Sequence, residues 1–192
     1  MKTKLKNLAS VQMGYSFRSR LEPEQTGNIA VIQMKDLTED NLVDRQSLVL
    51  IELNDFKEHH KVELNDLVFR SRGQTNTAAL VDVSIGSSVV AAPLLRIRIE
   101  KDSILPAYLC WFINQPSSQA YMQSKATGTA IRMIGKSVVD DLEVIVPSIE
   151  LQQHIVKLEK LSSQEQHLMN KLSIKKRLLM NKVLIDLAAT IQ

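Results

Sequence analysis

The segment from Ser148 to Gln192 contains neither proline nor glycine, and this constrains the fold more than any other feature. Ser148 is suited to cap a helix, and Glu150 lies where the positive end of the helix dipole favours an acidic side chain. The pattern predicts one long helix, about 60 Å in length at 1.5 Å per residue. An isolated helix cannot bury an apolar stripe, so we expect it to pack on a partner helix. Folding back on its own domain is the alternative.

The apolar residues of this segment follow an imperfect heptad repeat, which is polar in its middle and near its end. Such a seam is typical of a coiled coil. The apolar members of the seam, which we predict to form a dimer interface, are Leu151, Ile155, Leu158, Met169, Leu172, Leu179 and Val183.

Residues 1–147 indicate an α+β domain with a mixed sheet, in which strands come first and helices later. Runs of β-branched and apolar residues predict strands at 28–34, 48–51, 66–72, 78–83 and 88–99, with a bend or edge at Pro93. Proline at a first helical position predicts helices from Pro106 and from Pro116 to residue 122. A Ser137-x-x-Asp140 capping box predicts a brief helix before a strand at 143–146.

Composition excludes several classes of protein. With 44% hydrophobic and 23% charged residues the chain is not intrinsically disordered. No apolar stretch could span a bilayer and the N-terminus is not a secretory signal, so we expect a cytoplasmic protein without a membrane partner. The single cysteine, Cys110, excludes an internal disulfide and a cysteine-based zinc site.

The charge balance requires that any DNA contact be local. The net charge is only +3, and residues 1–147 contain 17 basic and 17 acidic side chains. A nucleic acid would therefore have to bind to a patch rather than to a uniformly basic surface.

Catalytic motifs are missing from the sequence. The segment 130–137 matches a phosphate-binding loop only loosely, because bulky side chains fill its interior. Methyltransferase motifs and Gly-x-Gly are absent, and the four histidines lack the spacing of a metal site. We expect no catalytic residues, no metal and no cofactor in this chain.

Three Arg-x-Arg pairs are the candidate DNA contacts: Arg18/Arg20, Arg70/Arg72 and Arg96/Arg98. In an extended chain residues i and i+2 point the same way, so each pair presents two guanidinium groups to phosphate or guanine. The third pair alternates with apolar residues, which favours the solvent face of a half-buried strand instead.

The loop after Arg70 carries the side chains that recognise guanine and adenine in the major groove. We expect base contacts from Arg72, Gln74 and Asn76. The expected phosphate contacts are Arg18, Arg20, Arg132 and Lys136, and the predicted interface also includes Ser16, Arg70 and Thr129.

The order of motifs along the chain resembles the specificity subunit of type I restriction-modification systems. The motifs are Gly14-Tyr-Ser-Phe17, a strand from Ile29 ending in Asp36-Leu37, the segment Asp66-Leu-Val-Phe69 to Gly73, Pro106-Ala-Tyr108-Leu109, Ala126-Thr-Gly128-Thr-Ala-Ile131, Gln152-Gln-His-Ile155-Val156 after Pro147, and Lys175-Lys-Arg-Leu178-Leu179. Asn65 stands where the family has glycine, and Ser148 and Leu151 also depart from its pattern.

The resemblance implies a target recognition domain, 1–147, followed by a conserved helix, 148–192, for dimerisation and subunit docking. A full specificity subunit has two of each, so the chain resembles a half-subunit that would homodimerise and recognise an inverted, bipartite site in double-stranded DNA. The resemblance also implies a non-catalytic protein. Methylation and cleavage would reside in a methyltransferase subunit and a restriction/translocase subunit, which use S-adenosylmethionine and ATP.

Two other functions remain open from the sequence. The chain could be the detached recognition domain of a fused methyltransferase–nuclease, although a start at Met1 and a distinct helical tail favour a separate protein. It could also be a protein-interaction module that binds no DNA and whose arginine pairs are only solvated. A salt titration would separate the last case, because DNA binding must weaken linearly with log salt.

Overall fold

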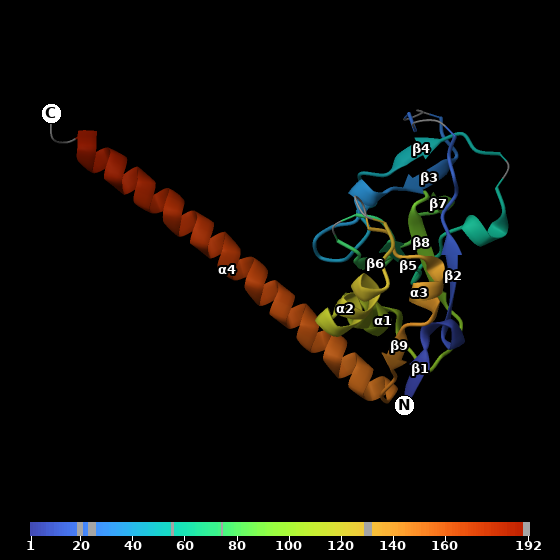
Figure 1. Ribbon diagram of the computed structural model, residues 1–192. Coiled ribbons are helices and arrows are strands. Elements are labelled where there is room, and N and C mark those ends of the chain that lie inside the picture. The colour runs from blue at the N-terminus through green and yellow to red at the C-terminus, as the bar shows by residue number, and fades with distance from the viewer. Residues whose placement is uncertain (19–20, 23–25, 55, 74, 129–131, 190–192) are drawn as a thin grey trace. The chain divides into compact units, whose positions relative to one another are not determined.

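The structure is a computed structural model, and it describes residues 1–18, 21–22, 26–54, 56–73, 75–128 and 132–189 (Figure 1). The chain divides into two compact units, Met1–Gln153 and His154–Gln192. The first unit contains all the strands of the described residues, and the second is helical. None of the helices in the described part of the chain is long and apolar enough to cross a membrane.

A four-stranded antiparallel sheet forms the centre of the first unit (Figure 1). Its strands lie in the order β2 (Ala9–Met13), β8 (Leu94–Ile99), β5 (Leu67–Arg70) and β6 (Ala78–Leu80). Leu67, Val68 and Phe69 of β5 are fully buried, as expected for an inner strand covered on both faces.

A second sheet has three strands, in the order β4 (Val49–Ile51), β3 (Ile29–Ile32) and β7 (Ser88–Val90). The central strand is antiparallel to β4 and parallel to β7. Both of its faces are covered, which explains the unbroken apolar run 29–32. Ile32 packs in one cluster with Val68 of the four-stranded sheet, and Val31 packs in another with Phe17.

The termini of the first unit meet in a two-stranded sheet of β1 (Lys2–Lys4) and β9 (Glu143–Ile145). Three helices accompany the sheets: α1 (Pro106–Asn114), α2 (Pro116–Ser124) and α3 (Lys136–Asp140). Short 3-10 helices are η1 (Leu5–Asn7), η2 (Met34–Asp36) and η3 (Glu58–His60).

The long helix α4 spans Ile149–Ala189. The Ser148 hydroxyl accepts a hydrogen bond from the backbone N–H of Leu151 at 3.4 Å, so Ser148 caps the helix as predicted. Gln152 is buried and anchors the first turn. Its Nε2 donates to the carbonyls of Ser103 and Pro147, and its Oε1 accepts from the N–H of Leu105 at 2.8 Å.

The α+β fold with a long C-terminal helix is confirmed, and three local predictions need correction. The strand expected at 88–99 is two strands, because the chain bends at Ala92–Pro93 and passes from one sheet into the other. The predicted Ser137 cap is wrong, because α3 begins at Lys136 with Gly135 at its N-cap, two residues before Ser137. Strands β1 and β2 were not predicted, since neither segment shows the dense β-branched signal of the other strands.

Candidate nucleic-acid interface

Three loops that are distant in sequence converge at the end of β5. The Arg70 guanidinium donates to the carbonyls of Met34, at 3.2 Å, and Leu37. The N–H of Gly73 donates to the Arg132 carbonyl at 3.3 Å. We call residues 33–37, 71–77 and 126–134, as far as the structure describes them, the loop cluster.

The first of these loops is held by a buried carboxylate. Asp36 is fully buried and accepts hydrogen bonds from the N–H of Gln33 at 2.8 Å and from the Ser47 hydroxyl at 3.0 Å. Together with the Gln33 side chain it forms a capping box around η2. Burial raises the pKa of Asp36, and the two hydrogen bonds oppose that shift. The backbone of η2 is therefore fixed, while Met34 and Lys35 remain exposed.

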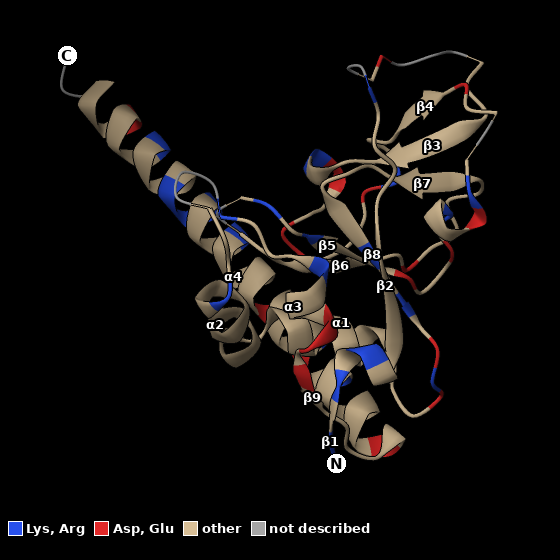
Figure 2. Cartoon of the chain, turned by 45° about the vertical axis from the view of Figure 1, so that its right-hand side comes forward, with Lys and Arg blue, Asp and Glu red and all other residues tan. Residues whose placement is uncertain are grey.

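The loop cluster presents cations that are not neutralised. Lys35, Arg72 and Arg132 are exposed, and none makes an ion pair with a described residue. The acid of the cluster, Asp36, is buried. Elsewhere on the first unit both signs of charge are interspersed (Figure 2). The cluster is thus a local basic patch on an otherwise neutral domain, which is what the charge count required for DNA binding.

The structure brings some of the predicted DNA contacts together and separates others. Arg72 and Arg132 both lie in the loop cluster, where Arg72 pairs through its backbone with Met133. Lys136, at the start of α3, is exposed and bonds to Asp140 at 2.8 Å. Three of the predicted residues, Arg20, Gln74 and Thr129, lie outside the described part of the chain.

Ser16 and Arg18 belong to a different surface. Both are exposed, but their neighbour Phe17 packs against the face of the three-stranded sheet formed by Val31 and Val49. The cluster that includes Ile32 and Val68 lies on the opposite face of that sheet. Residues 16–18 therefore cover the outer face of the small sheet.

Asn76, one of the predicted base contacts, is only 1% exposed and is engaged within the protein. Its Nδ2 donates to the Arg70 carbonyl at 2.9 Å, and its Oδ1 accepts from Gln123 Nε2 at 2.6 Å. Asn76 therefore ties the second loop to α2. The guanidinium of Arg70 is likewise bound within the protein, since it also contacts the Thr75 hydroxyl at 3.4 Å. Arg70 therefore connects the first and second loops to each other.

The arginines of β8 are bound within the protein: Arg96 is buried, contrary to the sequence pattern, and the side chain of Arg98 is partly exposed. Arg96 is 4% exposed, and Arg98 binds the buried carboxylate of Asp66 through Nε at 2.8 Å and Nη2 at 2.7 Å. Both guanidinium groups also donate to the Lys61 carbonyl, at 3.1 and 3.0 Å. The hydrogen bond to Asp66 raises the pKa of Arg98, whereas burial lowers that of Arg96. Both guanidinium groups therefore have their hydrogen-bond partners within the fold.

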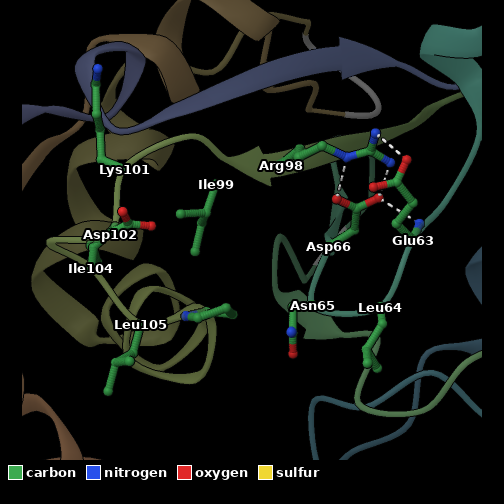
Figure 3. Close-up of a pocket in the computed structure, with 11 residues that line it drawn as sticks. Glu63, Leu64, Asn65, Asp66, Arg98, Ile99, Lys101, Asp102, Ile104 and Leu105 are labelled. Carbon is green, nitrogen blue, oxygen red and sulfur yellow. Dashed lines mark hydrogen bonds and ion pairs between the residues drawn. The ribbon is translucent and has the colours of Figure 1, made fainter.

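An open cavity of about 390 Å³ lies beside this ion pair (Figure 3). Segments 63–66 and 98–106 line it. The first contributes two acids, Glu63 and Asp66, and the second contributes Arg98, Lys101 and Asp102. A cavity of mixed charge has no preference for phosphate, which distinguishes it from the loop cluster. Among the described residues, no group of three His, Cys, Asp or Glu side chains could hold a metal ion.

The predicted dimer seam lies along the exposed surface of α4. Ile155 is half-buried. The exposed members, each between 43% and 67% exposed, are Leu151, Leu158, Met169, Leu172, Leu179 and Val183. Sequence analysis missed a second group. Ile174, Leu178 and Ile185 are 51%, 61% and 68% exposed, and at 100° per residue they lie roughly 200–240° around the helix from Leu172. The distal part of α4 therefore exposes apolar side chains on the face opposite the seam as well. Met180, Leu184 and Leu187 are also exposed and lie between the two groups on one side of the helix.

Lys35 and Met34 were also missed by the sequence analysis. The available signal was the Gln33–Asp36 capping box, which exposes the two residues between its ends. Neither residue belongs to an Arg-x-Arg pair, the pattern on which the predicted DNA contacts depend.

A protein family model matches most of the chain. The model, described as the type I restriction modification DNA specificity domain, covers residues 1–175. No curated protein matches the chain.

Solved structures with a similar fold come from the same systems. The HsdS subunit of Thermoanaerobacter tengcongensis has a TM-score of 0.62 and 16% identity over 86% of this chain and 37% of that one. The S subunit of a type I system from M. genitalium gives 0.54 and 16% over 88% and 40%. A third structure, concerned with complex assembly and conformational transition of the type I R-M system, gives 0.66 and 16% over 88% and 39%.

At this identity the likeness establishes the fold, and the chain spans about two fifths of the length of each of these proteins. The family match covers the loop cluster and most of α4. The chain belongs to the family of type I restriction-modification DNA specificity domains, which form the non-catalytic specificity subunit of these systems.

Proposed function

We propose that the chain is a half-specificity subunit, which recognises DNA and acts as the scaffold of a cytoplasmic type I restriction-modification complex. The observation that carries this proposal is the loop cluster, where Lys35, Arg72 and Arg132 are exposed on three converging loops without ion pairs to described residues. Such cations release counterions from the DNA backbone when they bind it. In this proposal residues 1–147 contact double-stranded DNA, and residues 148–192 bind other subunits.

Within the interface, Arg72 and Gln74 are the proposed base contacts, since Asn76 is buried. Lys35 and Arg132 flank them and are proposed to bind phosphate. Arg70 holds the loops in place from within the protein. Lys136, Arg18 and Arg20 are proposed as outlying phosphate contacts, and Ser16 and Thr129 as further contacts.

The seam of α4 is proposed to pair with the same helix of a second copy. Its apolar side chains from Leu151 to Val183 are exposed in the single chain, and a stripe of that length is best covered by a helix of equal length. A two-fold dimer would place the proximal half of one helix against the distal half of the other. The complex would then have two recognition domains related by two-fold symmetry.

The second stripe of α4, formed by Ile174, Leu178 and Ile185, needs a different occupant. One two-helix contact buries one face, so pairing through the seam would leave this stripe in water. We assign it to the methyltransferase subunit. A restriction/translocase subunit would join the complex through the methyltransferase, and the chain itself would carry no cofactor.

The DNA proposal is tested by a salt titration of the full chain in complex with its methyltransferase. Arg72→Ala and Arg132→Ala should each weaken binding, and loss of a phosphate contact should reduce the slope of log affinity against log salt by about one. Lys101→Ala is the matched control, because Lys101 is an exposed cation at the mixed-charge cavity, outside the loop cluster. Equal slopes for the control and both cluster variants would contradict the proposal.

The half-subunit proposal is tested by methylation mapping and sedimentation. A two-fold dimer must recognise two identical half-sites in inverted orientation, separated by unread bases. An asymmetric bipartite site produced by this gene alone would exclude it. Leu172→Asp should convert the dimer to a monomer, whereas Leu178→Asp should leave the dimer intact and weaken its contact with the methyltransferase.

A further inference from the structure

Met34 is an apolar side chain exposed at the centre of the basic loop cluster. It lies in η2, is 36% exposed, and precedes the exposed Lys35. Its Cε lies 3.7 Å from the position that a Cβ on Gly73 would occupy, so its methyl group rests over the backbone of the second loop. The N–H of Gly73 in turn bonds to Arg132 of the third loop. Met34 therefore lies where all three loops meet.

The backbone that carries Met34 is fixed from several sides. The capping box of Gln33 and Asp36 closes η2, and the N–H of Asp44 donates to the Asp36 carbonyl at 2.8 Å. The Met34 carbonyl itself accepts from Arg70. Single exposed apolar side chains are common on protein surfaces. Met34 differs from such residues in two ways: its backbone is fixed, and it lies beside three cations without ion pairs to described residues.

An apolar group in this position has a specific partner on DNA. Cations at Lys35, Arg72 and Arg132 would bring the loop cluster against the duplex, and Met34 would then face the groove. The major groove presents one apolar group, the C5-methyl of thymine, and apolar side chains recognise thymine through it. The thioether side chain is flexible and polarizable, so it adapts to a methyl surface.

We propose that Met34 is a specificity-determining residue that recognises the methyl group of one thymine in each half-site, and that Arg70 is the positioning residue that holds it there. This inference rests on the proposed DNA-recognition function. Each half-site would then contain an A·T pair that Met34 recognises, next to the bases contacted by the second loop.

The test removes the C5-methyl group of thymine from the DNA and, separately, the Met34 side chain from the protein. The full chain with its methyltransferase is bound to a duplex that carries the mapped recognition sequence, and each thymine is replaced in turn by deoxyuridine. One replacement in each half-site should weaken binding by about fourfold, the value of one buried methyl-sized group. Met34→Ala should bind the thymine and deoxyuridine duplexes equally.

Met13→Ala is the matched control. Met13 is exposed to a similar extent, 37%, but lies at the end of β2, outside the loop cluster. This variant should retain the fourfold difference. Because the side chain of Met34 is exposed, its removal opens no core cavity, and unchanged thermal unfolding of Met34→Ala would verify that the variant is folded. Arg70→Lys, which keeps the charge but loses the forked geometry, should reduce the discrimination without changing the salt slope.

The outcomes separate this inference from the function on which it rests. If the wild-type complex binds its duplex but no deoxyuridine replacement matters, or if Met34→Ala keeps the discrimination, the role of Met34 is refuted and the DNA-recognition function stands. A half-site without an A·T pair would refute it equally. If the wild-type complex binds no DNA in a sequence-specific manner, the proposed function itself fails.

Discussion

Replacing Asp66 by alanine should destabilise the first unit by about 3–5 kcal/mol, the cost of leaving a buried ion pair without one partner. Asp66 is 2% exposed, and its carboxylate accepts hydrogen bonds from Arg98 at 2.7 and 2.8 Å and from the Glu63 N–H at 2.8 Å. Arg96, also buried, lies 3.9 Å away. Removing the carboxylate leaves two guanidinium groups near each other without their buried counter-charge.

We expect the destabilisation by Asp66→Ala to be about 3 kcal/mol, the lower end of this range. Arg98 also contacts Glu63 at 2.7 Å, and that largely exposed carboxylate can retain part of the interaction. Arg96 has no such exposed partner among the described residues. A loss of about 3 kcal/mol is still a large fraction of the 5–15 kcal/mol that stabilises a typical domain. The variant should therefore fold only marginally.

The assay is urea unfolding of the full chain followed by the fluorescence of its single tryptophan, Trp111, which lies in α1 of the first unit. With m-values of roughly 1–3 kcal/mol/M, Asp66→Ala should lower the midpoint by at least about 1 M. The matched control is Asp141→Ala, which removes a carboxylate that is 44% exposed and pairs with Lys4 and Lys6. Its cost should stay below about 1 kcal/mol.

A double-mutant cycle with Arg98→Ala refines the test. Residues in direct contact should show a coupling energy of about 0.5–3 kcal/mol, so the double variant should lose less than the sum of the single losses. If Asp66→Ala shifts the midpoint no more than Asp141→Ala does, the buried ion pair does not stabilise the fold and the reasoning is refuted.

Three further predictions concern single residues. Asn65 has a φ of 72°, so Asn65→Ala should lower the free energy of unfolding by about 1 kcal/mol, whereas Asn65→Gly should not. Equal urea midpoints for the two variants would contradict this. Burial raises the pKa of the Cys110 thiol to about 12, so thiol reagents at pH 8 should label the chain only after unfolding, and rapid labelling of the folded chain would oppose the assignment. Burial lowers the pKa of His60 below its ordinary 6.5, so the neutral imidazole is favoured in the folded chain. The stability contributed by His60 should be complete above pH 6.5 and should be lost as the pH falls below 6.5 toward the lower pKa of the folded chain. Urea midpoints measured across this range should fall less steeply in His60→Gln.

The sequence predicted those elements whose signal is local. The apolar run at 29–32 and the proline-initiated helices α1 and α2 appear where expected, because β-branched residues favour strands and proline at the first helical position costs no hydrogen bond. Helix α4 was predictable from the absence of proline and glycine after Pro147 and from the Ser148 cap.

The candidate site was predictable only in part. Arg72 and Arg132 were identified from their side chains and from the loops around them, and both are exposed. Lys35 and Met34 were missed, because nothing in their own neighbourhood of the sequence indicates that the loop lies beside Gly73.

The sequence by itself determined that the chain is an α+β domain with a long helix, since periodicity, caps and breakers act over a few residues. Tertiary structure alone decided which arginines remain exposed. Arg70 and Arg72 share an extended segment, yet one is bound to carbonyls of the loop at 33–37 and the other is exposed. Arg96 likewise became buried because the segment ending at Lys61 covers it. The physical reason is that the hydrogen-bonding partner of a long side chain comes from a distant segment, which only the packing of the sheets brings into contact.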